Sequence, residues 1–433
     1  MYELFEININ KSLTISGLAL GKFLTYHYDN NSLALIKDKS IYNDLKLAYY
    51  GGITEVYRPY GENLYYYDVN SLYPYVALQD MPGNKCTQID YLGQQPNLNE
   101  LFGFFYCEIE VTENKYIGLL PYRTSKGLVF PLGNWRGWYF SEEIKLAVSQ
   151  GYKVNIIKGY KFNRVCDVFK SYINDIYKIK SSTKDSVERN LSKSLLNNLL
   201  GRFGLDINKA TSKILSHDSY ATIAAKYPIV SETTLEDNWH IISYLPSVDP
   251  SLCKSLGIDM VKLINKFNIP DESVSGYKDV SISVSAAVTS YGRIHMSKLK
   301  LAILDQGANI YYSDTDSIIT DKALDTNLVD ANILGKLKLE HKVSKGYFIS
   351  SKTYALVLED GSTVFKAKGL NSLSLTLNDY INMLKGELIT TGIKTISEKN
   401  YFLADRFLLK IKVSPWILLL TLKEVKYIVI ISE

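Results

Sequence analysis

Cysteine is scarce in this sequence, and long uninterrupted apolar runs are missing. Its 433 residues include four cysteines, which stand far apart and form no CxxC pair: Cys86, Cys107, Cys166 and Cys253. This spacing excludes a disulfide-rich scaffold and a cysteine-based zinc site. The most apolar segment, residues 416–431, is interrupted by three charged side chains. It is too polar and too short for a membrane span, so no membrane partner is expected.

An excess of charge of either sign is missing as well. Lysine and arginine number 49 against 45 aspartates and glutamates, which gives a net charge of +4. Any affinity for nucleic acid must therefore come from local clusters of basic residues. With 46% hydrophobic and 22% charged residues, the composition is that of a globular chain long enough for two or three packed units.

Two aspartates, Asp314 and Asp316, stand between apolar strand-forming runs at residues 308–312 and 318–320. The pattern predicts a β-hairpin that displays both carboxylates at its tip. A solvated acidic turn is the simplest interpretation of this stretch alone. A calcium loop of the EF-hand type does not fit, because its sixth residue would be Ile319 rather than glycine. Magnesium fits better, since proteins hold it with one or two carboxylates together with substrate phosphates.

A third carboxylate, Asp68, follows the aromatic run 63–67. This run predicts a strand, and Pro74 shortly after it favours the first turn of a helix. Asp68 would then lie at a strand end, where a carboxylate is held rigidly and still reaches solvent. A strand-end aspartate more commonly caps the following turn, so the functional interpretation depends on which side chains lie near it.

Residues 163–181 and 185–200 each carry apolar side chains at helical spacing, with a polar turn between them. The pattern predicts an αα-hairpin, and Gly201 is expected to close its second helix.

Three polar residues of the second predicted helix, Arg189, Lys193 and Asn197, are spaced i, i+4 and i+8. This spacing places them on one face, and Lys180 at the end of the first helix would lie close to it. A row of cations is usually a solvated helix face. Here few acidic residues are placed to pair with the cations, and the row suits a triphosphate, whose charge it would neutralise.

Two further stretches are less specific. Residues 279–304 predict a long helix that leads into the hairpin of Asp314, one half of a split βαβ arrangement. Farther upstream, Arg136 is flanked by Trp135 and Trp138. Such alternation of charge and rings suits a nucleic-acid groove, whereas large aromatic residues more commonly form a core.

Several segments together resemble a known family. YYYDVNSLYP at 65–74, KSLLNNLLG at 193–201 and YSDTDS at 312–317 are similar, in this order, to motifs A, B and C of family B DNA polymerases. Two shorter patterns resemble extra motifs of the protein-primed branch, namely Tyr49-x-Gly51-Gly52 and Lys352-x-Tyr354. The resemblance covers roughly residues 45–370 and is greatest to polymerases of mitochondrial linear plasmids.

The resemblance implies roles for individual residues. Asp68 and Asp316 are implied as ligands of two catalytic Mg²⁺ ions, with Asp314 beside them as a third catalytic carboxylate. The residues implied around the incoming dNTP are Ser71, Leu72, Tyr73, Lys180, Arg189, Lys193, Asn197 and Gly201, of which Tyr73 would exclude a 2′-hydroxyl. Those implied to contact primer–template DNA are Tyr49, Gly51, Gly52, Lys352 and Tyr354. Lys366 and Lys368 are basic and flanked by predicted strands, which suits contact with a nucleic-acid backbone.

The implied fold is an α+β right-hand polymerase with an antiparallel-sheet palm, helical-hairpin fingers and a small thumb. The expected parts are a segment 1–62 with the YxGG motif, palm residues 63–84 and 279–370, a palm insertion 85–162 for template and primer, fingers 163–204, a second insertion 205–278 and a thumb-like part 371–433. The implied partners are primer–template DNA, dNTPs and a terminal protein, and a monomer is expected.

The implied function is DNA-templated DNA synthesis by two-metal phosphoryl transfer, in the replication of a linear plasmid in the mitochondrion. The sequence departs from the family pattern at Leu200, where motif B usually has tyrosine, and in the apolar residues 411–433. Only 67 residues precede Asp68, without acidic exonuclease motifs, so a truncated member without a 3′–5′ exonuclease is expected. The alternative is a degenerate, inactive remnant that binds nucleic acid.

Overall fold

The structure is a computed structural model. It describes residues 2–8, 14–28, 32–36, 38–112, 116–124, 127–206, 210–227, 229–235, 238–244, 281–368, 375–387, 394–403, 406–415 and 430–431. The α-helices in these ranges are α1 (Tyr2–Phe5), α2 (Ile15–Tyr26), α3 (Lys39–Leu47), α4 (Leu72–Val76), α5 (Ser141–Ser149), α6 (Lys170–Ser182), α7 (Ser186–Phe203), α8 (His217–Lys226), α11 (Ile282–Asp305) and α12 (Leu377–Leu384).

A seven-stranded antiparallel sheet, called the palm sheet below, carries the aspartates. Its order is β1 (Thr54–Val56), β12 (Ile310–Asp314), β13 (Ser317–Thr320), β2 (Tyr60–Val69), β14 (Leu337–Ser350), β15 (Thr353–Leu358) and β16 (Thr363–Lys366). The predicted strand before Asp68 and the predicted hairpin at 308–320 are confirmed as β2 and the β12–β13 pair. All four residues of β13 are buried, which explains why two isoleucines follow each other in it.

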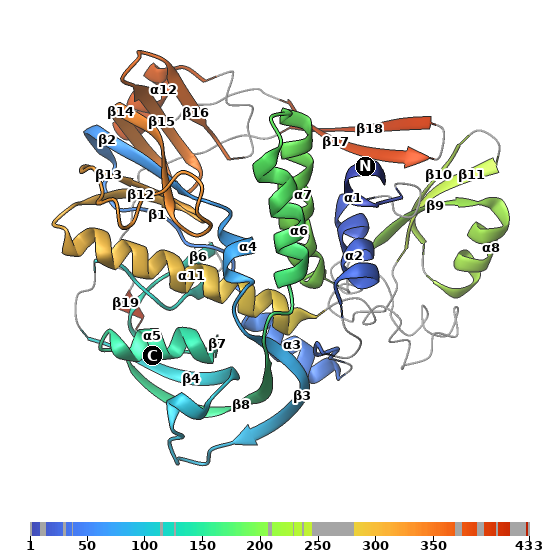
Figure 1. Cartoon of the computed structure of the whole chain (residues 1–433), viewed down its shortest axis with the longest axis horizontal. Coiled ribbons are helices and arrows are strands. Elements are labelled where there is room, and N and C mark those ends of the chain that lie inside the picture. The colour runs from blue at the N-terminus through green and yellow to red at the C-terminus, as the bar shows by residue number, and fades with distance from the viewer. Residues whose placement is uncertain are drawn as a thin grey trace.

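A second sheet of five strands lies on the other side of α11 from the palm sheet (Figure 1). Its order is β19 (Ile430–Ile431), β7 (Leu132–Phe140), β4 (Gly103–Val111), β8 (Lys153–Val165) and β3 (Met81–Asp90). A small hairpin of β5 (Tyr122–Thr124) and β6 (Gly127–Val129) accompanies it. Most of the region 85–162 lies in this sheet, which packs Phe105 and Trp135 into a separate cluster and Phe104 and Trp138 into the main core.

The interpretation of the residues around Arg136 as a nucleic-acid groove is wrong, and the alternative of an aromatic core is right. Trp135 and Trp138 are 2% and 4% exposed and belong to the core, while Arg136 donates to Glu108 Oε1 at 2.9 Å on the neighbouring strand. Trp135 and Trp138 are three positions apart and so lie on opposite faces of β7, where they belong to two different buried clusters, whereas Arg136 between them is exposed.

The predicted αα-hairpin is present as α6 and α7, with Asp185 capping α7 through a 2.7 Å bond from the Val187 amide. Two of its expected boundaries are wrong. Residues 163–165 end strand β8, because they pair with β3 instead of starting a helix. Gly201 lies inside α7, which continues to Phe203 because its last turn buries Leu199, Leu200 and Phe203. Tertiary packing here outweighs the local preference of glycine for a helix end.

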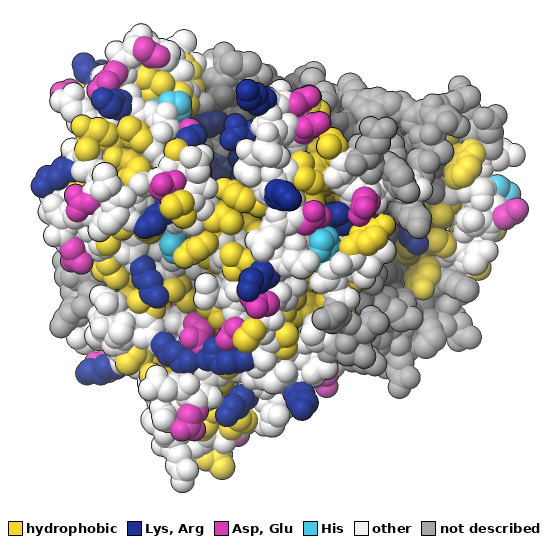
Figure 2. Space-filling model, in the orientation of Figure 1, with side chains coloured by type: hydrophobic (Ala, Val, Ile, Leu, Met, Phe, Trp, Pro, Cys, Tyr) yellow, Lys and Arg dark blue, Asp and Glu magenta, His cyan; other side chains and the backbone are white. Residues whose placement is uncertain are grey.

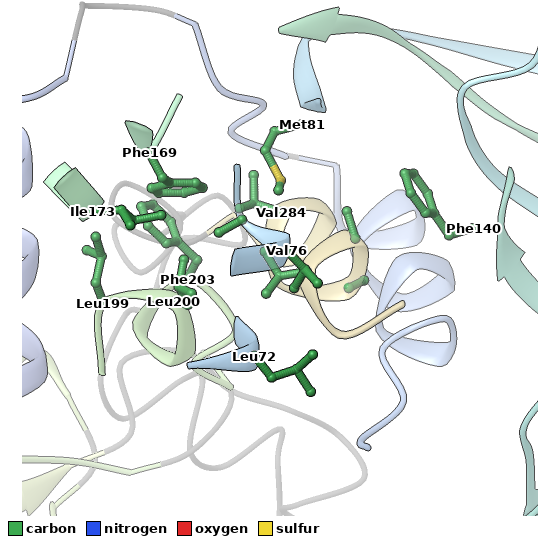
Figure 3. Packing of buried hydrophobic residues seen from close by; sticks show 14 of the residues in the cluster. Leu72, Val76, Met81, Phe140, Phe169, Ile173, Leu199, Leu200, Phe203 and Val284 are labelled. Carbon is green, nitrogen blue, oxygen red and sulfur yellow. The ribbon is translucent and has the colours of Figure 1, made fainter. Parts of the chain in front are cut away.

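One continuous core joins the hairpin to the palm (Figure 3). Leu72 and Val76 of α4, Ile173 of α6 and Val284 of α11 all belong to it. Sixteen residues of α11 are buried, many of them serine, alanine or glycine, and such small side chains let neighbouring elements approach this helix closely. The short helix that follows Asp68 is therefore anchored between the hairpin and α11.

The second insertion contains a small three-stranded sheet, β10 (Ile229–Thr234), β11 (Trp239–Tyr244) and β9 (Thr211–Ser216), next to α8. Residues 245–278 of the expected insertion lie outside the described residues. In the expected thumb, α12 is followed by a hairpin of β17 (Lys394–Leu403) and β18 (Arg406–Pro415). The apolar residues from 416 to 429 also lie outside the described ranges. None of the described helices combines the length and apolar character that a membrane crossing requires.

Candidate active site

Asp68 and Asp316 lie side by side at the centre of the palm sheet. Ser317 pairs with Asp68 across β13 and β2, and the Val69 amide donates to the Asp316 carbonyl at 2.8 Å. The turn between β12 and β13, residues 314–316, is called the aspartate turn below. It is closed by a 2.6 Å bond from the Asp316 amide to the Asp314 carbonyl. Thr315 at its tip has the left-handed φ of +56°.

The environment of these two carboxylates disfavours their ionisation. Burial raises the pKa of Asp68 from 3.8 to about 7, with further contributions from the charges of Asp316 and Glu340. Burial also raises the pKa of Asp316, and Asp314 adds to the shift. Lys193 acts in the opposite direction on both aspartates. Two partly buried carboxylates from neighbouring strands form a site that lacks positive charge.

Asp314 has a different environment, although it is only two residues away. Its Oδ1 accepts from Lys352 Nζ at 2.5 Å, from Thr54 Oγ1 at 2.9 Å and from Thr315 Oγ1 at 3.1 Å. This carboxylate already has a cation and two hydroxyl partners. The sequence pattern suggested that the hairpin displays both carboxylates alike, and this is not so. Asp316 lies beside Asp68, whereas Asp314 pairs with Lys352.

A cationic row consisting of Lys180, Arg189 and Lys193 stands on the α6–α7 hairpin, next to the two carboxylates. Burial and the charges of Lys193 and Arg189 lower the pKa of Lys180, so the three cations lie close together, as the helical spacing predicted. Lys180 Nζ donates to Ser71 Oγ at 2.7 Å. Figure 2 shows lysine and arginine side chains gathered in the hollow between the palm sheet and the hairpin.

Ser71 stands at the N-cap of α4 shortly after Asp68, and Leu72 and Tyr73 are the first two residues of this helix. Ser71 precedes α4 in the left-handed conformation, and its side chain makes no capping bond to the helix. Leu72 is buried, while Tyr73 is partly exposed and packs on α11 at Gly292. Burial and the neighbouring charge of Asp316 raise the pKa of Tyr73 to about 12, so its phenol is neutral at the edge of the site.

The segment with Tyr49, Gly51 and Gly52 runs along the aspartate turn. A Cβ on Gly52 would lie 2.9 Å from Thr315 Cγ2, and the Thr315 amide donates to the Ile53 carbonyl at 2.8 Å. Tyr49 covers Gly204 at the end of α7. A side chain at position 52 would push against the turn, which explains the glycine there.

Sequence reasoning missed a buried ion pair that holds this segment. Arg293 of α11 is 1% exposed and binds both oxygens of Glu143 on α5, at 2.6 and 2.8 Å. Its remaining N–H groups donate to Ser290 Oγ and to the carbonyls of Tyr50 and Gly51. Residues 143 and 293 are far apart in the sequence, and neither carried a local pattern that could have linked them.

Lys338 and Glu340 were missed as well. Lys338 pairs with Asp68 across β14 and β2, and it also lowers the pKa of Asp68, whereas Glu340 raises it. The alternating charges of 338–342 indicate an exposed strand face, but only the register shows that Asp68 lies beside it.

The remaining predicted residues differ in how far they are exposed. Asn197 and Gly201 are exposed on later turns of α7, and Lys366 and Lys368 are exposed at or just after the edge strand β16. The Tyr354 side chain is 6% exposed and packs against Tyr312 inside the palm sheet, with a ring-centroid distance of 5.0 Å. Of the Lys352–Tyr354 pair, only the lysine is exposed.

The side chains present fit divalent metal ions. Asp68 and Asp316 stand on neighbouring strands, and a bound cation would offset the burial and the neighbouring carboxylate charge that raise the pKa of each. Within the part of the chain that the structure describes, no group of three or more His, Cys, Asp and Glu converges. Two carboxylates completed by substrate phosphates are the arrangement that magnesium favours.

An antiparallel palm sheet with two central aspartates, faced by a cationic helical hairpin, defines the class of right-hand polymerase folds. Phi29 DNA polymerase, solved with primer–template DNA and incoming nucleotide, has this fold: its TM-score is 0.65 at 16% identity, over 94% of this chain and 68% of that one. Residues 1–303 match the family model for DNA polymerase type B, organellar and viral. The chain belongs to this family.

Two fungal relatives are similar over most of the chain. A probable DNA polymerase of Podospora anserina is 43% identical over 410 residues, which are 93% of this chain and 34% of that protein. A probable DNA polymerase of Neurospora intermedia is 35% identical over 372 residues, 83% of this chain and 35% of that protein. The chain thus spans about a third of the length of these curated relatives.

Proposed function

We propose that this chain carries the polymerase active site of a DNA-templated DNA polymerase, which adds dNTPs to a primer 3′-hydroxyl with two Mg²⁺ ions. The observation that supports this most is the partly buried pair Asp68 and Asp316 on neighbouring strands, with the cationic row of Lys180, Arg189 and Lys193 beside it. Polymerases of this family generally use divalent metal ions, and the two aspartates would hold them here.

Each part of the site has a task in phosphoryl transfer, which depends mainly on positioning and charge neutralisation. Two metal ions bound to Asp68 and Asp316 would activate the primer hydroxyl and stabilise the leaving pyrophosphate. Lys180, Arg189 and Lys193 would bind the triphosphate, and Tyr73 would lie under its sugar. Lys352, oriented by Asp314, would contact the primer end. Asn197 and Gly201 would border the new base pair, and Tyr49, Gly51 and Gly52 the template.

The biological setting is also a proposal. Replication of a linear plasmid in the mitochondrion, with a terminal protein as partner, is the proposed setting, and the family description, which names organellar and viral polymerases, is compatible with the organelle. Primer–template DNA is the proposed substrate of this chain, because the phi29 polymerase of the same fold was solved in complex with it.

A primer-extension assay tests the function. Asp68→Ala and Asp316→Ala are expected to abolish incorporation and to leave binding of primer–template DNA largely intact. Glu359→Ala, an exposed carboxylate of the same sheet region, is the matched control and is expected to retain activity. Wild-type protein that binds DNA but incorporates no nucleotide would support the inactive remnant instead.

A further inference from the structure

A second contact between the hairpin and the palm lies outside the residues assigned above. Tyr177 is on α6, one turn before Lys180, whose ammonium lies over the Tyr177 ring at 5.3 Å from its centroid. The Tyr177 hydroxyl donates to the backbone carbonyl of Asn332 at 2.7 Å. Asn332 belongs to the segment 328–337 between β13 and β14, which is called the platform loop below.

The platform loop is held firmly by its own hydrogen bonds. Asp330 Oδ1 accepts from the amides of Asn332 and Ile333 at 2.7 and 2.8 Å. The Leu337 amide donates to the Leu328 carbonyl at 3.0 Å, and the Asp330 amide donates to the Leu337 carbonyl at 2.9 Å. A loop with this many internal bonds offers the Asn332 carbonyl at a fixed position.

The same loop is tied to the strand end that carries Asp68. Asn70 Nδ2 donates to the carbonyls of Asp330 and Ile333 at 2.7 and 3.2 Å. The Asn70 backbone exchanges two further bonds with the loop, one to the Lys336 carbonyl and one from the Gly335 amide. Asn70 lies two residues after Asp68, so the platform loop and the aspartate pair share one rigid base.

We infer that Tyr177 is a positioning residue. It holds the hairpin against the platform loop and so fixes the distance of the cationic row from Asp68 and Asp316. This inference rests on the proposed polymerase function. Lys180 is hydrogen-bonded to Ser71 here and must exchange this partner for phosphate when a nucleotide binds. Tyr177 binds a backbone carbonyl that no nucleotide replaces. It therefore keeps the hairpin in the same position relative to the palm sheet while Lys180 changes its partner.

The test compares Tyr177→Phe, which removes only the hydroxyl, with the wild-type protein. One lost hydrogen bond is expected to raise KM for dNTP and Kd for magnesium pyrophosphate together, by about 2- to 12-fold. The values of kcat and of Kd for primer–template DNA are expected to stay within about twofold of wild type, and the thermal midpoint within about one degree. A merely structural role would instead lower the midpoint and weaken DNA binding.

Two variants of the platform loop sharpen the test. Asn332→Ala is the matched control, because Asn332 accepts through its backbone carbonyl, and it is expected to behave as wild type. Asp330→Ala releases the loop and is expected to reproduce the shift of Tyr177→Phe. The double variant Tyr177→Phe/Asp330→Ala is expected to be no weaker than the worse single variant, since both remove the same contact. Additive effects, or unchanged KM and Kd in Tyr177→Phe, would overturn the inference.

Pyrophosphate binding is measured without primer or synthesis, so the two proposals fail separately. Wild-type protein that makes no DNA, while Tyr177→Phe still weakens pyrophosphate binding, would contradict the polymerase function and support the docking role. Active wild-type protein with equal pyrophosphate affinity in Tyr177→Phe would do the opposite. Wild-type protein without affinity for pyrophosphate would overturn both.

Discussion

At the scale of single residues, two aspartates of one sheet have opposite electrostatic environments. Asp314 is paired with Lys352 at 2.5 Å, and its charge is balanced in the protein as it stands. Asp68 is partly buried beside Asp316, and the loss of solvent together with the neighbouring negative charge raises its pKa to about 7. The first aspartate contributes an ion pair to the fold, whereas the second is held in a place that suits a metal ligand and costs stability without one.

This contrast predicts a stability effect of Asp68→Asn. Because burial raises the pKa of Asp68 in the folded state above the value of 3.8, the unfolded chain releases this proton at lower pH than the folded chain does. The folded state therefore loses stability as the pH rises from about 4 to about 7. Without metal, Asp68→Asn is expected to raise the melting temperature at pH 8 by a few degrees, and the gain is expected to vanish near pH 4.

Thermal unfolding in a chelator, followed by titration with Mg²⁺, measures this effect. Wild-type protein is expected to be stabilised by the metal, since a ligand that binds only the folded state shifts the equilibrium, and Asp68→Asn far less so. Asp314→Asn serves as the contrast: it removes the ion pair with Lys352 and is expected to lower the melting temperature slightly. A loss of stability in metal-free Asp68→Asn at pH 8 would contradict the assigned environment.

The position of Tyr73 predicts that the enzyme selects dNTPs over rNTPs. Its ring packs on α11 at Gly292, where a Cβ would lie 3.4 Å from Tyr73 Cε1, so the ring is fixed from behind. Tyr73→Val removes it, and the ratio of kcat/KM for rNTP to that for dNTP is expected to rise about 10- to 200-fold, the range that one missing steric contact gives. Tyr73→Phe keeps the ring and is expected to keep the discrimination; equal use of both nucleotides by wild type would refute the role.

At the scale of elements, the aspartate turn depends on a segment distant in sequence. Residues 51–54 reach it in three ways: Gly52 packs against Thr315, the Ile53 carbonyl accepts from the Thr315 amide, and Thr54 donates to Asp314. The left-handed Thr315 at the tip is a strained position for a β-branched residue. Its surroundings, more than its own preference, keep the turn in this shape.

Gly52→Ala is therefore expected to displace the aspartate turn and to reduce kcat tenfold or more, because misplacement by about 1 Å can cost about 10²-fold. The added Cβ would meet Thr315 Cγ2 at 2.9 Å, so Thr315→Ser, which removes this methyl group, is expected to restore part of the activity in the double variant. Gly51→Ala meets nothing within 4 Å and is expected to cause a smaller loss. Rates from single-turnover extension give the comparison, and wild-type kcat in Gly52→Ala would disprove it.

At the scale of the whole molecule, α11 is the element on which the other parts meet. The palm sheet lies on one side of it and the five-stranded sheet on the other (Figure 1), and the hairpin packs near its N-terminal end. The ion pair of Arg293 with Glu143 of α5 crosses the boundary between α11 and the second sheet. All five N–H groups of Arg293 have acceptors, so the pair is fully satisfied although it is buried.

Removing only one partner of this ion pair is expected to lower the free energy of unfolding strongly. Arg293→Met leaves Glu143 as a buried, unpaired carboxylate, and such a loss typically destabilises by about 3–5 kcal/mol. The double variant Arg293→Met/Glu143→Leu removes both charges and is expected to recover most of that stability. Denaturant unfolding of the four proteins in the cycle measures the coupling. Additive losses in the double variant would show that the charges do not act on each other.

Much of the site followed from the sequence, for a physical reason. Strands and helices impose periods of two and 3.6 residues, so the strand before Asp68, the hairpin of Asp316 and the row of Arg189 and Lys193 could all be located from local patterns. Gly201 shows where local preference fails: it predicted a helix end, but α7 continues to Phe203, whose side chain is buried together with Leu199 and Leu200.

The sequence by itself determined which elements form and which residue types they bring to the site. Only the tertiary structure decided which of these residues meet. It places Asp316 beside Asp68 and pairs Asp314 with Lys352. It also joins Arg293 to Glu143, and this ion pair holds the glycine segment. Arg293 and Glu143, for example, are 150 positions apart. The partners in such contacts are set by strand register and by close packing of the whole chain, and no local period in the sequence encodes either.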